Sequence, residues 1–204
     1  LAVRIKDSSN YGVPKKIGGI TYGVHLGETY TDWSEGSFKV TDNTTDLAIG
    51  GQGFFAVEFT DKEGNTSVKL SRDGAFKVDV NGYLVTANGD HVLNATGALN
   101  MQAGQNNWVR VEPNSEFEVN SMGYITQNNQ IVGTIGLVDV ENYDYIEKYG
   151  ENLYNLVEGG NVVASDAQIE QGILETSNVN VVSEMVNMIT IQRAYEAGQK
   201  VITS

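Results

Sequence analysis

The sequence predicts a mainly β fold, in which an antiparallel core domain rich in β-hairpins is followed by a C-terminal amphipathic α-helix. Two observations carry this prediction. The 204 residues include 23 glycines but only 2 prolines, a bias that favours glycine-punctuated turns between short strands. Apolar runs separated by turn sequences fill the middle of the chain, whereas residues 180–203 contain neither proline nor a turn cluster. A hydrophobic content of 40% is enough for a packed core, and the length corresponds to one or two domains.

The first segment, residues 1–35, is predicted to be extended. Within it, residues 1–16 hold four basic side chains against one acidic side chain, a charge of +3, among Asn, Gly and Ser residues. This composition is typical of a solvated strand or loop. The β-rich core domain is then expected over residues 36–173, and the helical segment over residues 174–204.

The core domain is predicted to contain an early β-hairpin. Residues 47–59 form an apolar run around the cluster Gly50-Gly-Gln-Gly53, and residues 61–65 supply a hydrophilic turn. The cluster lacks the third glycine of a dinucleotide-binding loop, and Phe54-Phe55-Ala-Val continues it as a strand rather than as a helix. We therefore expect a glycine-rich bend here and no phosphate site.

A meander of tight antiparallel strands is predicted next. Residues 75–80 alternate apolar and polar side chains, and Asn81-Gly82 is the strongest two-residue hairpin signal. Residues 83–86 return toward a second turn at Asn88-Gly89. The unit recurs weakly 41 positions later, where Phe76, Val78, Gly82, Tyr83 and Leu84 align with Phe117, Val119, Gly123, Tyr124 and Ile125. Duplication and convergent hairpin chemistry explain this recurrence equally well.

The last segment is predicted to form the amphipathic helix. Its apolar and aromatic side chains recur at spacings of 3, 4 and 7, which is typical of one helix face. The predicted stripe, defined by this spacing, consists of Val181, Val182, Met185, Met188, Ile189, Gln192 and Tyr195. Asn178 or Asn180 can cap the N-terminus of the helix. Glu184 lies near the positive end of the helix dipole, and Lys200 lies near the negative end.

Burial of this stripe requires a partner. Burying its five aliphatic or methionine side chains, at about 1.5–3 kcal/mol each, contributes on the order of 10 kcal/mol. Two partners remain open from the residues alone. One is the sheet of the same domain, and the other is a helix from another molecule or from an N-terminal segment outside this chain. The abrupt end at Ser204 favours the second.

Composition excludes several functional classes. With 26 acidic and 13 basic residues the net charge is −13, so a nucleic-acid binder is not expected. The absence of cysteine excludes disulfides, thiolate metal sites and cysteine nucleophiles. His25 and His91 lie far apart without metal-binding spacing, and no apolar run approaches the ~18 residues of a membrane span. We expect no metal, no cofactor and no membrane insertion.

No catalytic residue can be assigned from the sequence. Glu116 and Glu118 could form a glycosidase pair, but alternating acids are typical of a solvated strand face. Asp79, Asn81 and Asp90 resemble a calcium loop only faintly, because an EF-hand needs a bidentate Glu at its twelfth position and flanking helices. One hypothesis from the residues is therefore a secreted acidic β-domain that binds glycan or calcium through its turns.

Three segments resemble the bacterial flagellar axial proteins of the rod and hook. Residues 174–202 (LETSNVNVVSEMVNMITIQRAYEAGQKVI) are similar to a long C-terminal signature of that family. Residues 46–57 (DLAIGGQGFFAV) and 71–86 (SRDGAFKVDVNGYLVT) resemble its core motif, and residues 150–154 (GENLY) resemble a short family element. Together they cover about half of the chain in the family's order.

The resemblance implies a non-enzymatic structural subunit of the flagellar basal-body rod. Such a subunit would assemble with copies of itself and other axial proteins into a helical tube that transmits torque to the hook. It would reach the basal body by type III export without a cleaved signal peptide. The family's first helix and last helical stretch are missing here, so we expect a trimmed core whose stripe packs in an inner helical layer. The short span of residues 87–173 favours a distal-rod type, with a proximal-rod type next.

Overall fold

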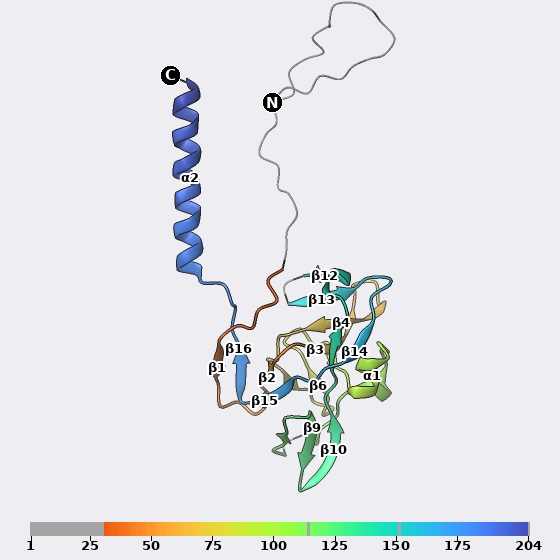
Figure 1. Ribbon diagram of the computed structural model, residues 1–204. Coiled ribbons are helices and arrows are strands. Elements are labelled where there is room, and N and C mark those ends of the chain that lie inside the picture. Colours follow the sequence, from red (N-terminus) through yellow and green to blue (C-terminus); the bar gives the residue numbers. More distant parts are fainter. Residues whose placement is uncertain (1–30, 114, 151, 204) are drawn as a thin grey trace, which may run out of the picture. The chain divides into compact units, whose positions relative to one another are not determined.

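The computed structural model describes residues 31–113, 115–150 and 152–203 (Figure 1). The predicted extended segment, residues 1–35, lies almost entirely outside the described residues. The boundaries expected after residues 35 and 173 therefore stay predictions.

The prediction of a mainly β, antiparallel fold is confirmed. The largest sheet has nine strands among the described residues, in the order β12-β13-β4-β3-β7-β6-β5, with β11 pairing both β3 and β14. The strands of this sheet are β3 (Phe54–Thr60), β4 (Thr66–Ser71), β5 (Lys77–Val78), β6 (Leu84–Val85), β7 (His91–Val92), β11 (Leu137–Val140), β12 (Ile146–Tyr149), β13 (Leu153–Leu156) and β14 (Val162–Ala164). Because β11 pairs the start of β3 and β7 pairs its middle, the two share one edge of β3.

Three smaller sheets complete the described part of the β domain. A three-stranded sheet has the order β10-β9-β8, β2 pairs with β15, and β1 pairs with β16. Their strands are β1 (Phe38–Val40), β2 (Leu47–Gly50), β8 (Glu118–Val119), β9 (Tyr124–Gln127), β10 (Gln130–Thr134), β15 (Gln168–Gln171) and β16 (Ile173–Glu175). Short helices connect strands at α1 (Ala95–Leu99), η1 (Gln105–Asn107) and η2 (Tyr143–Tyr145).

The glycine cluster divides the apolar run of residues 47–59 between two sheets. Gly51 and Gly53 have φ angles of +117° and +155°, which favour glycine over residues with a side chain. The chain therefore leaves β2, bends, and starts β3 in the main sheet. The expected bend is confirmed, and the predicted hairpin is formed by β3 and β4 around residues 61–65.

Three hairpin turns use the same side-chain arrangement. In each, the first residue is an Asp or Asn whose Oδ1 accepts hydrogen bonds from the backbone N–H groups two and four residues later. These residues are Asp61, Asp79 and Asn120, and the following glycines with positive φ are Gly64, Gly82 and Gly123. Asp79 and Asn120 are 41 positions apart, so the sequence recurrence corresponds to the same turn formed twice.

The core lies where the main sheet meets the smaller sheets. Phe55 and Phe76 pack edge to face with ring centroids 5.1 Å apart, and both are almost completely buried. The rest of the cluster comprises Leu47, Ile49, Val57, Leu84, Val92, Val109, Val111, Phe117, Val119, Ile125, Ile135 and Ile169. Every one of the four sheets except β1–β16 contributes side chains to this cluster.

The predicted C-terminal helix is confirmed as α2 (Val181–Thr203). Asn180 is its N-cap, because its Oδ1 accepts hydrogen bonds from the N–H groups of Val182 and Ser183 at 3.1 and 3.2 Å. Glu184 lies in the first turn and Lys200 in the last turn, as predicted. In the described part of the chain, no helix has the length and apolar character that a membrane span requires.

Candidate functional site

The predicted stripe lies entirely on α2 and is exposed in the single chain. Its apolar side chains range from 51% exposed at Ile189 to 71% exposed at Val182. Gln192 is also exposed, and its Nε2 lies 3.4 Å from Oε1 of Glu196. Tyr195 accepts a hydrogen bond from Gln199 at 3.0 Å. The structure thus shows where the stripe residues lie, and their role in assembly stays a prediction.

The apolar surface of α2 is wider than the predicted stripe. Val186 and Ile191 are 56% and 69% exposed and flank the stripe on either side. At 3.6 residues per turn, the apolar positions from Ile191 to Val186 span an arc of roughly 220°, within which Glu184 lies next to Ile191 and Arg193 next to Val186. A helix with so broad an apolar surface is suited to contact neighbours on more than one side. Sequence reasoning missed these two residues because it followed one narrow helical face.

The two chain segments that join the β domain to α2 and to the N-terminal region form what we call the neck, residues 34–37 and 175–178. Oε1 of Glu175 accepts a hydrogen bond from Gly36 N at 2.8 Å, and Thr176 N donates to Ser37 O at 2.8 Å. The Asn178 side chain donates to Ser34 O at 3.0 Å. Asn178 therefore ties the two segments together, while Asn180 caps the helix.

Gly36 permits this close approach. A Cβ at this position would lie only 1.8 Å from Thr176 O. Any larger residue would force the two segments apart. The neck continues into the β1–β16 ribbon, where Phe38 pairs with Glu175 and Val40 with Ile173.

A clasp, the ion pair of Arg72 and Glu175, holds the neck to the core. The guanidinium Nε lies 2.9 Å from Oε2 of Glu175, and the two side chains are only 19% and 11% exposed. The same guanidinium donates to the carbonyl oxygens of Gly51 and Gly53 at 3.1 and 3.3 Å, in the glycine bend. Through these contacts, the Arg72 side chain joins its own loop, the glycine bend and Glu175 of the neck. Hydrogen bonds to a charged group contribute more to stability than neutral ones.

Sequence reasoning did not assign a role to the clasp. Arg72 lies in the SRDG motif, its carbonyl acceptors lie in the GGQG cluster, and Glu175 lies in the ETSN motif. The only sequence signal for the clasp was that all three segments belong to stretches that resemble the same family. The structure brings them together at one point.

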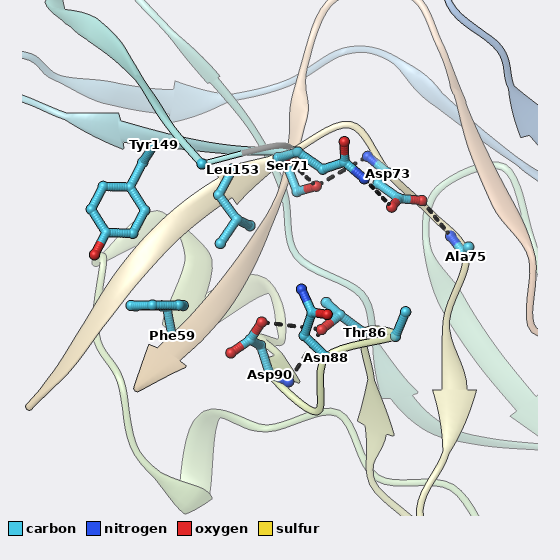
Figure 2. Close-up of a pocket in the computed structure, with 12 residues that line it drawn as sticks. Phe59, Ser71, Asp73, Ala75, Thr86, Asn88, Asp90, Tyr149 and Leu153 are labelled. Atoms are coloured by element: carbon cyan, nitrogen blue, oxygen red, sulfur yellow. Dashed lines mark hydrogen bonds between the residues drawn. The ribbon is translucent and has the colours of Figure 1, made fainter. Parts of the chain in front are cut away.

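A cavity of about 450 Å³ lies between the turn that joins β6 to β7 and the turn that joins β12 to β13 (Figure 2). Phe59 and Tyr149 line one side, with ring centroids 5.3 Å apart. Asp73 and Asp90 lie on opposite walls of the cavity in Figure 2.

Hydrogen bonds within the walls occupy both carboxylates. Oδ2 of Asp73 accepts from Asn152 of the GENLY element at 2.8 Å, and Oδ1 accepts from Ala75 N at 3.0 Å. Oδ2 of Asp90 lies 3.2 Å from the Thr86 hydroxyl. Burial raises the pKa of Asp90, which the hydrogen bond from Thr86 partly offsets. These contacts close turns and join two motif segments.

The acids singled out from the sequence also serve the fold. Glu116 and Glu118 are both exposed, as expected for a solvated strand face. Asp79 accepts hydrogen bonds from Asn81 and Tyr83 and closes a hairpin turn. The described residues contain no group of three or more His, Asp or Glu side chains arranged to hold a metal ion. These four acids, Glu116, Glu118, Asp79 and Asp90, therefore lie in turns or on exposed surface.

Comparison with protein families matches two regions of the chain. Residues 48–127 match the D1 domain of the flagellar hook protein FlgE/F/G group, and residues 170–204 match the C-terminal region of the flagellar basal body rod FlgEFG proteins. The two regions together cover more than half of the chain, and they contain the glycine bend, the clasp and α2.

Curated relatives match most of the chain. The flagellar basal-body rod protein FlgG of Buchnera aphidicola subsp. Schizaphis graminum is 35% identical over 89% of this chain and 69% of its own length. FlgG of Bacillus subtilis is 31% identical over 91% of this chain and 70% of its own length. FlgF of Caulobacter vibrioides, also a basal-body rod protein, is 36% identical over 84% of this chain and 65% of its own length. The chain thus spans about two thirds of the length of these relatives.

Proposed function

The chain belongs to the flagellar basal-body rod protein family as a structural subunit most like FlgG, the distal-rod type, and on this premise we propose that it assembles through the exposed surface of α2. In this proposal the β domain folds within one chain, and α2 packs against helices of neighbouring subunits in a helical tube. Non-closing contacts between identical subunits are what produce an open filament. The tube would carry torque to the hook.

The exposure of the stripe supports this proposal. Six apolar side chains of the stripe are each more than half exposed, and a soluble monomer rarely leaves so continuous an apolar surface uncovered. The apolar arc of roughly 220° fits a helix that is surrounded by others. Only two charged residues, Glu184 and Arg193, occur between residues 181 and 195, so packing there would bury few charges.

The clasp and neck supply the second part of the proposal. They hold the chain that precedes α2 against the β domain, through Glu175, Thr176 and Asn178. A helix that must enter a bundle loses less entropy on assembly when the chain just before it is already anchored. We infer that the clasp sets where each α2 meets its neighbours.

Several finer points complete the proposal. We infer that the partners are copies of this chain and other axial proteins of the rod and hook, and that the site of action is the basal body. Export in an unfolded state, without a cleaved signal peptide, agrees with a chain that has no cysteine to form a disulfide. We assign no catalytic role to any residue.

The proposal is tested by placing a charge on the stripe. Val182→Asp and Ile189→Asp put a carboxylate on the apolar surface, and Asn187→Asp puts the same charge on the opposite side of α2 as a matched control. We expect both stripe variants to abolish swimming and to remove the chain from purified basal bodies, because an unpaired buried charge opposes packing. The Asn187→Asp control should retain swimming and should be present in purified basal bodies.

Two results would count against this role of α2. Normal incorporation of the stripe variants would show that the stripe is not an assembly surface. Unfolding of the β domain in the purified variants, measured by thermal denaturation, would show that the stripe belongs to the domain's own core.

A further inference from the structure

The hairpin formed by β9 and β10 exposes an apolar surface that neither the fold nor α2 uses. The hairpin patch, as we call it, consists of Met122 in the turn that precedes β9, Tyr124 on β9, and Ile131 and Val132 on β10. These side chains are 75%, 39%, 68% and 43% exposed. The hairpin extends beyond the main sheet in Figure 1. Exposed apolar patches of this kind mark interaction surfaces.

Strand register gives the hairpin one buried face and one exposed face. Ile125 and Gln127 are almost completely buried, and side chains alternate along β9, so Tyr124 and Thr126 point the other way. Ile131 pairs with Thr126, and Thr134 pairs with Tyr124. Tyr124 and Ile131 therefore lie on the same exposed face of the sheet.

The charge distribution singles out this hairpin. Residues 119–138 form the longest stretch of the chain without a charged residue or histidine, although the whole chain carries a net charge of −13. Two copies of so acidic a protein repel each other over most of their surfaces. Interface cores are depleted of charged residues and enriched in Tyr and Met. An uncharged, partly apolar surface is the kind of site at which a second copy can approach.

We propose that the hairpin patch contacts a second copy of this chain, at a surface other than the same patch. This inference rests on the proposed rod function, because a contact of a patch with itself would close a dimer, whereas contact with a different surface continues a filament. The contact is formed by side chains rather than by strand addition. The register shift between Ile131 and Gly133 disrupts the free edge of β10, and such bulges oppose edge-to-edge pairing.

The test uses adjacent positions on opposite faces of β10. Ile131→Glu places a carboxylate in the patch, and Gln130→Glu places one next to it, on the face shared with Gln127. Both positions are exposed, so both variants should fold with unchanged thermal denaturation. We expect Ile131→Glu to lower the amount of chain in purified basal bodies about tenfold or more, and Gln130→Glu to leave it unchanged.

Photo-cross-linking identifies the partner. The photoreactive residue p-benzoylphenylalanine is placed at position 131 or at position 130 in cells, and basal bodies are irradiated and analysed by mass. A product of two copies of this chain, joined from position 131 to a site outside residues 119–138, is the expected result at 131 but not at 130.

The other outcomes overturn the inference. A product with a different protein, a 131-to-131 product, or no product from normally assembled chain would each show that the patch does not contact a second copy as proposed. Normal incorporation of Ile131→Glu would have the same meaning. Absence of the unsubstituted chain from basal bodies would instead contradict the rod function itself, and the hairpin contact with it.

Discussion

The β domain and helix α2 are both rich in apolar side chains but bury them in opposite ways. In the domain, Phe55 and Leu70 are completely buried, whereas Met188 and Ile191 of α2 are 68% and 69% exposed. The domain therefore gains its stability from contacts within one chain. The apolar side chains of α2 stay largely exposed, so most of their packing energy is still available for association. The molecule thus combines a domain that buries its apolar side chains with a helix that leaves them exposed, as our proposal for assembly requires.

The β domain and α2 also differ in where their hydrogen-bonded polar side chains lie. Within the described residues, no buried side-chain nitrogen or oxygen lacks a hydrogen-bond partner. Glu58, for example, is only 7% exposed, and its carboxylate accepts from Trp108 Nε1 at 2.7 Å. Side-chain hydrogen bonds on α2 join exposed neighbours instead. Buried polar groups of the domain are thus satisfied by contacts within the described chain, and three substitutions test how far the domain depends on the helix.

The largest effect is expected from Phe55→Ala. Removing this buried ring should destabilise the domain by about 3–5 kcal/mol, from lost burial and the cavity left beside Phe76. Urea denaturation of a Trp33→Phe background, in which Trp108 is the remaining tryptophan, should show the loss in fluorescence, while the circular dichroism signal of α2 changes separately. Phe38→Ala, at a ring that is 41% exposed on β1, should cost less than about 1.5 kcal/mol. If the fluorescence and circular dichroism transitions both moved to lower urea concentration together, α2 would pack on the domain. The contrast between the two regions would then be wrong.

An intermediate effect is expected at the clasp, where the two regions join. Arg72→Met removes the donors but keeps most of the side-chain length, and should cost about 2 kcal/mol. Hydrogen exchange at the amides of Gly36 and Thr176 should accelerate, because the neck opens locally. Arg110→Met is the matched control at an exposed arginine. Unchanged exchange in the Arg72 variant would show that the neck does not depend on the clasp.

A smaller effect is expected at high pH and only in the β domain. Burial, together with a 2.7 Å hydrogen bond to Asp139, raises the pKa of Tyr143 to about 12 from 10.0. Between these values the folded state keeps a proton that the unfolded state releases, so stability falls as pH rises from 10 to 12. Melting temperatures of Tyr143→Phe should decline less steeply above pH 10. Equal slopes for the two proteins would contradict this assignment.

Local chemistry made much of the fold predictable. The turns at residues 61–65 and 81–82 are defined by residues that lie within five positions of one another, and the structure has both. Local spacing also predicted the span of α2 and limited its N-cap to Asn178 or Asn180, of which the structure has Asn180. The stripe could be listed from periodicity alone, although its true width could not, because Val186 and Ile191 lie outside one face.

The arrangement of the sheets could not be predicted in the same way. The pairings of β2 with β15 and of β1 with β16 join residues more than 110 positions apart. The clasp joins Arg72 to Glu175 across 103 positions. No periodicity or turn motif relates such distant residues. A single arginine in a charged surface loop and an arginine in a buried clasp look alike in sequence, and only the folded chain distinguishes them.

The geometry of the β1–β16 ribbon has a mechanical consequence. Both neighbouring segments leave the ribbon at the same end, beside the Phe38–Glu175 pair. A force that pulls them sideways, apart from each other, would break the hydrogen bonds one at a time, starting with the bond from Asn178 to Ser34 and then the bond from Gly36 to Glu175. A force applied to both segments along the ribbon would move the two strands together and pass to the clasp and the core. The ribbon thus resists little force when the two segments are pulled apart sideways. It resists more force when both segments are pulled in the same direction along the ribbon.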